Sequence, residues 1–257
     1  MTRRRRAGPG EVGELGGEQV EGRRAVLELL EAATRPVTTV TMAKVAGGDP
    51  LLDRIARLAG PALRVVGPER LDAIARTEVH QGVVANAAPL EPTDLDGLLG
   101  APDAFLVALD GITDPRNLGA VLRSAETAGA TGAILPRHRS ARITPVVAKS
   151  AAGAIEHLPI ALVGGIPAAL DRAARSGVWT VGLDEDGPMT VHDLELATQP
   201  LVLVLGAEGR GLARLTRERC DVVVRIPVHG SVASLNVAAA AAVACHEVAR
   251  RRDLAGA

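Results

Sequence analysis

The chain has 257 residues, of which 47% are apolar, so it can bury the core of one large domain or of two modest ones. One Phe, one Trp and no Tyr exclude an RNA surface built mainly on stacked aromatic rings. The formal net charge of −1 excludes a basic field over the whole molecule, so a polyanionic partner would have to bind local patches of the 29 basic residues.

The cysteines and the hydropathy of the chain argue against several further classes of protein. Cys220 and Cys245 lie far apart and form no CxxC pair, which argues against a zinc site and against a disulfide framework. No apolar run reaches the ~18 residues of a membrane span, and the Arg-rich N-terminus lacks the apolar segment of a signal peptide. We therefore expect a cytoplasmic protein with no metal site and no membrane contact.

Residues 1–19 are rich in Arg, Gly and Glu, and we expect them to form a disordered tail. Gly8, Gly10 and Gly13 satisfy GxGxxG, but no strand precedes them, so they are not a dinucleotide-binding fingerprint. The arginines at 3–6 are open to two interpretations, a contact with nucleic acid or a solvated tail.

Residues 20–88 predict a small α/β domain, because short elements of both kinds alternate along them. The apolar spacing predicts helices and strands in this order: helix 21–33, strand 37–43, helix 50–60, strand 63–66, helix 68–76 and strand 82–87. Residues 89–102 contain three prolines and three acidic residues, which indicates a linker or a loosely packed crossing segment.

Residues 103–257 predict a larger α/β domain whose sheet carries helices on both faces. Continuous apolar runs such as 201–206 are typical of strands buried on both faces of a parallel sheet. The expected strands are 104–110, 132–136, 178–184, 201–206 and 222–227, and the expected helices are 117–129, 143–153, 166–176, 211–219 and 235–251.

The stretch "DGITDPRNLGAVLRSAETAG" at 110–129 ends one of these strands and begins a helix. Its apolar positions form a stripe that predicts one packed face, and Arg116 and Arg123 fall nearly opposite that stripe. Asn117 stands where an N-cap would be. The segment is therefore either a capped helix with solvated arginines or one wall of a binding site.

Two further loops follow strand ends in the same way. "LGAEGRGL" at 205–212 projects Glu208 from a glycine-rich turn, and after residues 226–227 Ser234 and Asn236 open an Ala-rich helix that we expect to be buried. A surface Glu and two capping residues are the plain alternatives. Because the carboxyl ends of parallel strands share one edge of a sheet, the three loops are expected to meet in one crevice.

The motifs "LDGITDPRNLGAVLRSAETAG", "LGAEGRGL" and "IPVHGSVASLNVAAA" resemble, in order and spacing, those of the SpoU (TrmH-type) family of ribose 2′-O-methyltransferases. The resemblance covers residues 105–251 and implies a parallel sheet with a deep trefoil knot, the SPOUT class. "VEGRRAVLELL" and "RTEVHQGVVA" resemble the ends of the L30e-like substrate-binding domain in members that methylate a guanosine of 23S rRNA.

The resemblance implies S-adenosylmethionine as cofactor, RNA as substrate and a homodimer packed through the knotted region. It implies catalytic roles for Asn117, Arg123, Glu208, Ser234 and Asn236. It places the cofactor against Leu205, Gly206, Ala207, Gly209, Ile226, Pro227, Ser234, Leu235 and Asn236. For RNA contacts we expect Arg23, Arg24, Arg116, Arg137, Arg139 and Arg142.

The chain departs from the family pattern at two positions: Arg116 stands where His is frequent, and Ala238 where Ser is frequent. A guanidinium is not expected to lose its proton, so we expect Arg123 to hold phosphate and stabilise the developing alkoxide. Glu208 would orient Arg123 and Asn117 or relay the proton. The open alternatives are another rRNA ribose, including one linked to antibiotic resistance, a tRNA ribose, a non-catalytic RNA-binding relative, and a nucleotide-dependent dehydrogenase.

Overall fold

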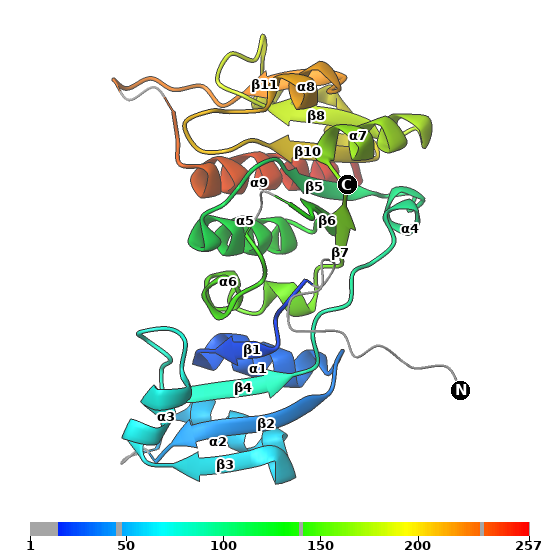
Figure 1. Ribbon diagram of the computed structural model, residues 1–257. Coiled ribbons are helices and arrows are strands. Elements are labelled where there is room, and N and C mark those ends of the chain that lie inside the picture. The colour runs from blue at the N-terminus through cyan, green and yellow to red at the C-terminus, as the bar shows by residue number, and fades with distance from the viewer. Residues whose placement is uncertain (1–14, 45–47, 139–140, 232–233, 257) are drawn as a thin grey trace, which may run out of the picture.

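The computed structural model describes residues 15–44, 48–138, 141–231 and 234–256, which form two sheets joined by a short connection (Figure 1). The smaller sheet has four strands in the order β1-β4-β2-β3, and the larger has seven in the order β7-β6-β5-β10-β8-β11-β9. All pairings in the larger sheet are parallel, as the apolar runs predicted.

The N-terminal unit confirms the predicted alternation of elements. Its strands are β1 (Gln19–Glu21), β2 (Val37–Ala43), β3 (Leu63–Val66) and β4 (Val83–Ala87), and its helices are α1 (Arg23–Ala32), α2 (Pro50–Ala59) and α3 (Pro68–Ile74). Asp49 caps α2 by accepting hydrogen bonds from the amides of Leu51 and Leu52. The sequence did not predict β1, because three residues are too few to establish a period of two.

The expected tail at 1–19 is corrected at its C-terminal end. Residues 1–14 lie outside the described residues, but Leu15 is buried and Gln19 begins β1. Gly16 forms a parallel bridge with Ile143, and Gly16 and Gly17 adopt φ of 92° and 88°, which glycine accepts readily. These two glycines let the backbone run directly along Ile143, so residues 15–19 belong to the fold.

The large sheet is built from β5 (Phe105–Leu109), β6 (Gly132–Pro136), β7 (Ile160–Val163), β8 (Trp179–Leu183), β9 (Met189–Thr190), β10 (Leu201–Leu205) and β11 (Val222–Arg225). Its helices are α4 (Leu95–Leu99), α5 (Pro115–Thr127), α6 (Pro145–Ala151), α7 (Ile166–Arg175), α8 (Arg214–Glu218) and α9 (Val237–Gly256). β7 and β9 were not predicted, since β9 has only two residues and the apolar run IALV of β7 shows no alternation that distinguishes a strand from a buried helix.

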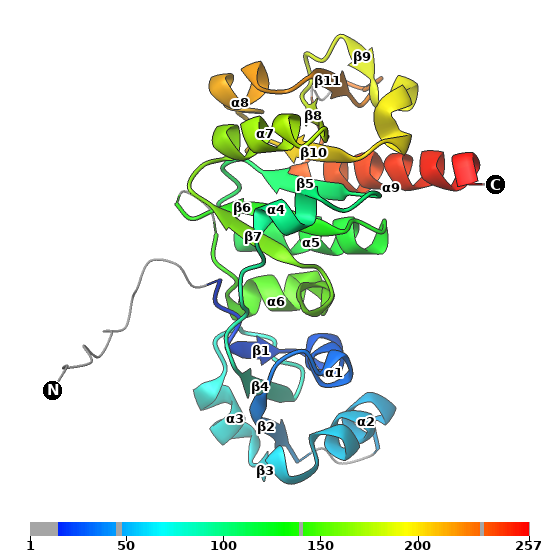
Figure 2. The same cartoon turned by 90° about the vertical axis from the view of Figure 1, so that its right-hand side faces the viewer.

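Alternate side chains of β5 divide the core between the two faces of this sheet. Phe105 and Val107 pack with α5, α6 and α9, whereas Leu106 and Ala108 pack with α4 and α7. Figures 1 and 2 show these two helical layers on opposite sides of the sheet. The prediction of a sheet covered by helices on both faces is confirmed.

The segment 89–102 is more ordered than a loose linker. Residues 95–99 form α4, whose three leucines are buried against the large sheet, and Asp94 caps the helix through the amide of Gly97. The amide of Thr93 donates to the carbonyl oxygen of Ile160. The expectation of loose packing is therefore wrong for this part of the segment, because its leucines cover an otherwise exposed sheet face.

Helix α9 is buried on one face only, although its alanines suggested burial nearly all around. Ala241 and Cys245 are fully buried, but Val243 is 39% exposed and Leu254 is 66% exposed. Near the end of the helix the buried carboxylate of Glu247 accepts hydrogen bonds from Arg250 and Arg251. No helix among the described residues is long and apolar enough to cross a membrane.

The Glu247 carboxylate should make the stability of the protein depend on acid pH. Hydrogen bonds from Arg250 lower the pKa of Glu247 to about 2 from an ordinary value of 4.5. A pKa lowered by folding stabilises the fold above the unfolded-state value, and this contribution disappears as the pH falls toward the folded-state value. Glu247→Gln should therefore cost ~1 kcal/mol of unfolding free energy near neutral pH, and less below about pH 4. Urea unfolding at several pH values checks this, and an equal difference at all pH values would contradict it.

Candidate active site

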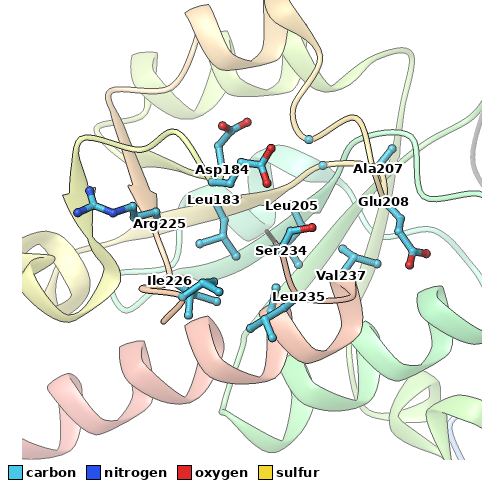
Figure 3. A pocket seen from close by; sticks show the side chains of 16 residues that line it. Leu183, Asp184, Leu205, Ala207, Glu208, Arg225, Ile226, Ser234, Leu235 and Val237 are labelled. Carbon is cyan, nitrogen blue, oxygen red and sulfur yellow. The ribbon is translucent and has the colours of Figure 1, made fainter. Parts of the chain in front are cut away.

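The carboxyl ends of β5, β8, β10 and β11 meet at one edge of the large sheet, and the segments that follow β8, β10 and β11 surround a pocket (Figure 3). Its volume is about 500 Å³, within the range of small-molecule sites. The lining residues come from four segments: Leu183, Asp184, Glu185, Leu205, Gly206, Ala207, Glu208, Gly209, Gly211, Arg225, Ile226, Val228, Ser234, Leu235, Val237 and Ala240. The expected convergence of the second and third motif loops is confirmed.

A tight turn after β10 forms one wall of this pocket. The amide of Gly211 donates to the carbonyl oxygen of Ala207 at 2.9 Å, which closes the turn on itself. A Cβ at Gly206 would lie 2.2 Å from the carbonyl carbon of Gly211, so a side chain there would collide with backbone. Gly211 has a φ of 62°. The glycines thus create a compact turn that carries Glu208 at its tip.

Two carboxylates hold the far end of that turn. Asp184, directly after β8, accepts a hydrogen bond from the amide of Leu212 at 3.4 Å and lies 2.5 Å from the guanidinium of Arg217. Asp110, directly after β5, accepts from the amide of Ala213 at 3.3 Å. Burial tends to raise the pKa of Asp184, but the hydrogen bonds from Arg217 and from two amides outweigh it and lower the pKa.

Three polar side chains from the three predicted motifs form one hydrogen-bond network. The side-chain amide of Asn117 donates to Glu208 Oε2 at 3.0 Å. The amide of Asn236 donates to Glu208 Oε1 at 3.3 Å and to Asn117 Oδ1 at 3.2 Å. Both carboxylate oxygens of Glu208 therefore accept from amide groups that are 91 and 28 residues away in sequence.

The capping roles at these helices are divided differently from the prediction. Asp114, not Asn117, is the N-cap of α5, and it accepts from the amides of Arg116 and Asn117 at 2.7 and 3.0 Å. The side chain of Asn117 is consequently free to reach Glu208. Asn236 both caps α9 and joins the network, because its Oδ1 accepts from the amide of Ala238 while its Nδ2 donates to Glu208.

Arg123 does not contact Glu208, contrary to one of our expectations. Arg116 and Arg123 are exposed on α5, away from its buried stripe, as the helical spacing predicted. Within the part of the chain that the structure describes, the Arg123 guanidinium forms no hydrogen bond or ion pair, and Glu208 accepts from Asn117 and Asn236 instead. The fold therefore leaves Arg123 open to a ligand or to water.

Most residues predicted to hold the cofactor line the pocket: Leu205, Gly206, Ala207, Gly209, Ile226, Ser234 and Leu235. Pro227 and Asn236 are not among its lining residues. Sequence reasoning missed eight lining residues: Leu183, Asp184, Glu185, Gly211, Arg225, Val228, Val237 and Ala240. The signal for Asp184 was an acid at the end of the strand predicted at 178–184, just as Asp110 ends the strand predicted at 104–110.

The arginines predicted to bind RNA differ in whether their side chains already have partners within the protein. Arg24, Arg116, Arg137 and Arg142 are exposed, and Arg139 lies outside the described residues. Arg23 is already engaged, since it pairs with Asp49 and donates from Nε to the carbonyl oxygen of Gln81. Among the described residues, no group of three or more His, Cys, Asp or Glu side chains could hold a metal ion.

Comparison with known proteins shows to which family the chain belongs. Residues 104–246 match the SpoU rRNA Methylase family. The chain belongs to the SpoU family. Residues 19–93 separately match the family of RNA 2′-O ribose methyltransferase substrate-binding domains. This SpoU protein is an RNA 2′-O-methyltransferase, and enzymes of its type use S-adenosylmethionine.

Relatives and solved structures are similar along almost the whole chain. The 23S rRNA (guanosine-2′-O-)-methyltransferase RlmB of Pseudomonas putida is 39% identical over 92% of this chain and 98% of its own. An uncharacterized tRNA/rRNA methyltransferase of Mycolicibacterium vanbaalenii is 42% identical over 91% of this chain and 77% of its own. The crystal structure of the SpoU methyltransferase AviRb from Streptomyces viridochromogenes, in complex with AdoMet, is 30% identical with a TM-score of 0.77. The match covers 92% of this chain and 90% of the AviRb chain.

Proposed function

We propose that this SpoU enzyme methylates the ribose 2′-oxygen of a guanosine in 23S rRNA. The observation that carries the proposal is similarity to RlmB of Pseudomonas putida over 98% of that protein, because it includes both the N-terminal unit and the methyltransferase sheet. A chain of known structure named for 2′-OH methylation of C/U34 on tRNA matches over its whole length, but covers only 61% of this chain. We place the enzyme in the cytoplasm, where its proposed substrate lies.

The pocket at the sheet edge suits S-adenosylmethionine, which carries a positive sulfonium and a positive amino group. Three carboxylates in the lining, those of Asp184, Glu185 and Glu208, outnumber the one guanidinium, that of Arg225, and the glycines let backbone approach closely. We propose that backbone at Gly206, Ile226 and Leu235 holds the cofactor. When bound, the cofactor supplies an electrophilic methyl group.

The remaining task of the protein is to align the ribose hydroxyl and to manage its proton. Alignment alone can supply several kcal/mol of the barrier, up to ~7–11 in the best cases. We propose that Asn117 and Asn236 orient the Glu208 carboxylate beside the pocket, where it orients the 2′-hydroxyl and relays its proton. Arg123, which is exposed and unpaired within the described chain, would hold a substrate phosphate and stabilise the developing alkoxide. Ser234 would act from the pocket wall.

The proposal includes the domain organisation implied by the family. Residues 20–88 would be the L30e-like RNA-binding domain, 89–102 its connection, and 103–257 a methyltransferase domain whose chain forms a deep trefoil knot around the loops at 206–236. The exposed side of α9, including Val243 and Leu254, supports a homodimer packed through that knotted region. The exposed arginines at 24, 116, 137 and 142 would contact RNA.

Mapping of ribose methylation in RNA from a deletion strain tests the target. We expect one 2′-O-methylguanosine of 23S rRNA to disappear, and the wild-type gene but not one carrying Glu208→Gln to restore it. Loss of a tRNA methyl group, or of an rRNA methyl group on another base, would replace the proposed target. An unchanged methylation pattern, together with no methyl transfer by the purified protein to rRNA, would favour a non-catalytic relative.

A further inference from the structure

The side chain of Arg35 lies buried where the two sheets of the protein meet. It stands between α1 and β2, and 6% of the side chain is exposed. Its Nε and Nη2 donate to Oε2 and Oε1 of Glu156 at 2.9 and 2.6 Å. Glu156 belongs to a short 3-10 helix between α6 and β7, and its side chain is fully buried. The pair is a bidentate contact between the N-terminal unit and the methyltransferase unit.

The same guanidinium also binds backbone on the segments that enter and leave the N-terminal unit. Its Nη1 donates to the carbonyl oxygen of Gly17 at 2.8 Å and to that of Ala88 at 2.5 Å. Gly17 directly precedes the first residues of the N-terminal unit, and Ala88 directly follows its last strand. One side chain therefore joins the entry of the unit, its exit and the neighbouring unit.

Two other side-chain contacts at the same junction each have at least one exposed partner. His157 Nε2 lies 3.1 Å from Glu28 Oε2, and Lys149 donates from Nζ to the carbonyl oxygen of Val79. Exposed contacts of this kind contribute little to holding two units in one orientation. Among the ion pairs of the described residues, Arg35–Glu156 is the one with both partners buried.

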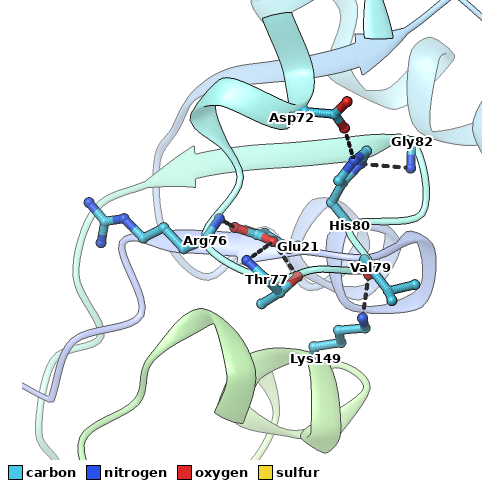
Figure 4. A network of polar contacts seen from close by, with 8 residues as sticks. All are labelled: Glu21, Asp72, Arg76, Thr77, Val79, His80, Gly82 and Lys149. Carbon is cyan, nitrogen blue, oxygen red and sulfur yellow. Dashed lines mark hydrogen bonds and ion pairs between the residues drawn. The ribbon is translucent and has the colours of Figure 1, made fainter. Parts of the chain in front are cut away.

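The loop that Lys149 reaches is itself held firmly. Figure 4 shows residues 76–82 between α3 and β4, above the helix that carries Lys149. The buried carboxylate of Glu21 accepts from the amides of Arg76 and Thr77 at 2.6 and 3.1 Å. His80 lies 2.8 Å from Asp72 and accepts at Nδ1 from the amide of Gly82. The surface of the N-terminal unit beside the junction is therefore preformed.

The junction is connected to the active site through two tightly packed helices. A Cβ at Gly119 of α5 would lie 2.6 Å from the carbonyl oxygen of Val147 in α6, so the two backbones are in direct contact. Helix α5 carries Asn117 and Arg123, and Glu156 follows closely after α6. The orientation set by Arg35 is thus defined relative to the helix that carries the predicted catalytic residues.

We propose that Arg35 is a positioning residue for methyl transfer: through Glu156, Gly17 and Ala88 it holds the RNA-binding unit in one orientation relative to the active site. A bidentate ion pair fixes direction as well as distance, which an apolar contact of equal size does not. RNA held by the first unit then meets the second in one register. The inference rests on the proposed function in one respect, that residues 19–93 hold the RNA.

The test replaces the pair by Arg35→Met/Glu156→Met, since an apolar pair of similar volume often keeps a protein folded. We expect S-adenosylmethionine affinity within about twofold of wild type but kcat/KM for 23S rRNA lowered by about 10- to 100-fold, because the RNA is misplaced rather than unbound. Arg35→Lys keeps the charge but not the fork, so its kcat/KM should fall between those of wild type and of the double variant. Arg54→Ala breaks an exposed ion pair with Glu31 inside the N-terminal unit and is the matched control.

Small-angle X-ray scattering gives a measurement that does not depend on activity. A single orientation of the two units is expected for wild type and a broadened distribution for the double variant. Independent motion of the units in wild type, or wild-type kcat and KM in a folded double variant, would overturn the inference. If wild type methylates no RNA, the proposed function fails, whereas the scattering result still decides the role of Arg35.

Discussion

Replacing Arg123 by alanine should slow methyl transfer at saturating RNA by about 10²–10³-fold, the loss typical of removing one donor that stabilises developing negative charge. The side chain is exposed on α5, on the helix that carries Asn117, and forms no ion pair within the described chain. Its charge is therefore available to the substrate rather than neutralised inside the protein. S-adenosylmethionine affinity should stay within about twofold, because Arg123 does not line the pocket.

Single-turnover rates and RNA affinities, measured separately, distinguish the two roles of Arg123. Arg123→Lys keeps the charge but loses the fork, so it should recover part of the rate. Arg116→Ala is the matched control, since Arg116 is equally exposed on the same helix and is proposed only as an RNA contact. That variant should weaken RNA binding without changing the chemical step. If Arg123→Ala lowers RNA affinity alone, the stabilisation of the alkoxide by Arg123 is wrong.

Replacing Gly206 by alanine should abolish measurable cofactor binding, a loss of more than about 100-fold in affinity, because the turn that forms the pocket wall must open. The added Cβ would lie 2.2 Å from the carbonyl carbon and oxygen of Gly211 and 2.5 Å from the amide nitrogen of Leu212. Backbone atoms cannot move aside as a flexible side chain can. The displaced turn would carry Glu208 away from Asn117 and Asn236, at a cost in stability of about 1–3 kcal/mol.

Calorimetric titration with S-adenosylmethionine and thermal unfolding measure the two effects of Gly206→Ala. Gly230→Ala is the matched control, because Gly230 lies in the third motif loop and a Cβ there would meet no atom within 4 Å. The control should bind the cofactor as wild type does. Wild-type affinity in a folded Gly206→Ala protein would show that the close approach to Gly211 is not needed for the pocket.

The family motifs and the parallel sheet could be predicted because their signals are local. A continuous apolar run at 201–205 indicates a strand buried on both faces, and Gly206, Gly209 and Gly211 indicate a turn that approaches something closely. Very short strands were missed because they carry no local pattern. β1 has three residues, which is too few for a period to appear, and the four residues of β7 are all apolar, so they show no alternation.

The prediction of the candidate site was partial. The sequence predicted that Asn117, Glu208 and Asn236 would share a crevice, since each follows a strand of one sheet. It did not predict which donor each oxygen of Glu208 would accept from. Helix caps were divided wrongly at Asp114 and Asn117, because the pattern before a helix offers several capping residues and only the backbone course selects one.

By itself the sequence determined the order of most helices and strands, the motif loops and the family, since periodicity, turn residues and motif spacing act between neighbours in the chain. The tertiary structure alone decided the partners of charged and polar groups. Asn117 and Glu208 are separated by 91 residues, and Arg35 and Glu156 by 121. Local patterns do not encode such pairs, because a contact between distant segments exists only after the sheets and helices have packed and the cost of burying each polar group has selected its partner.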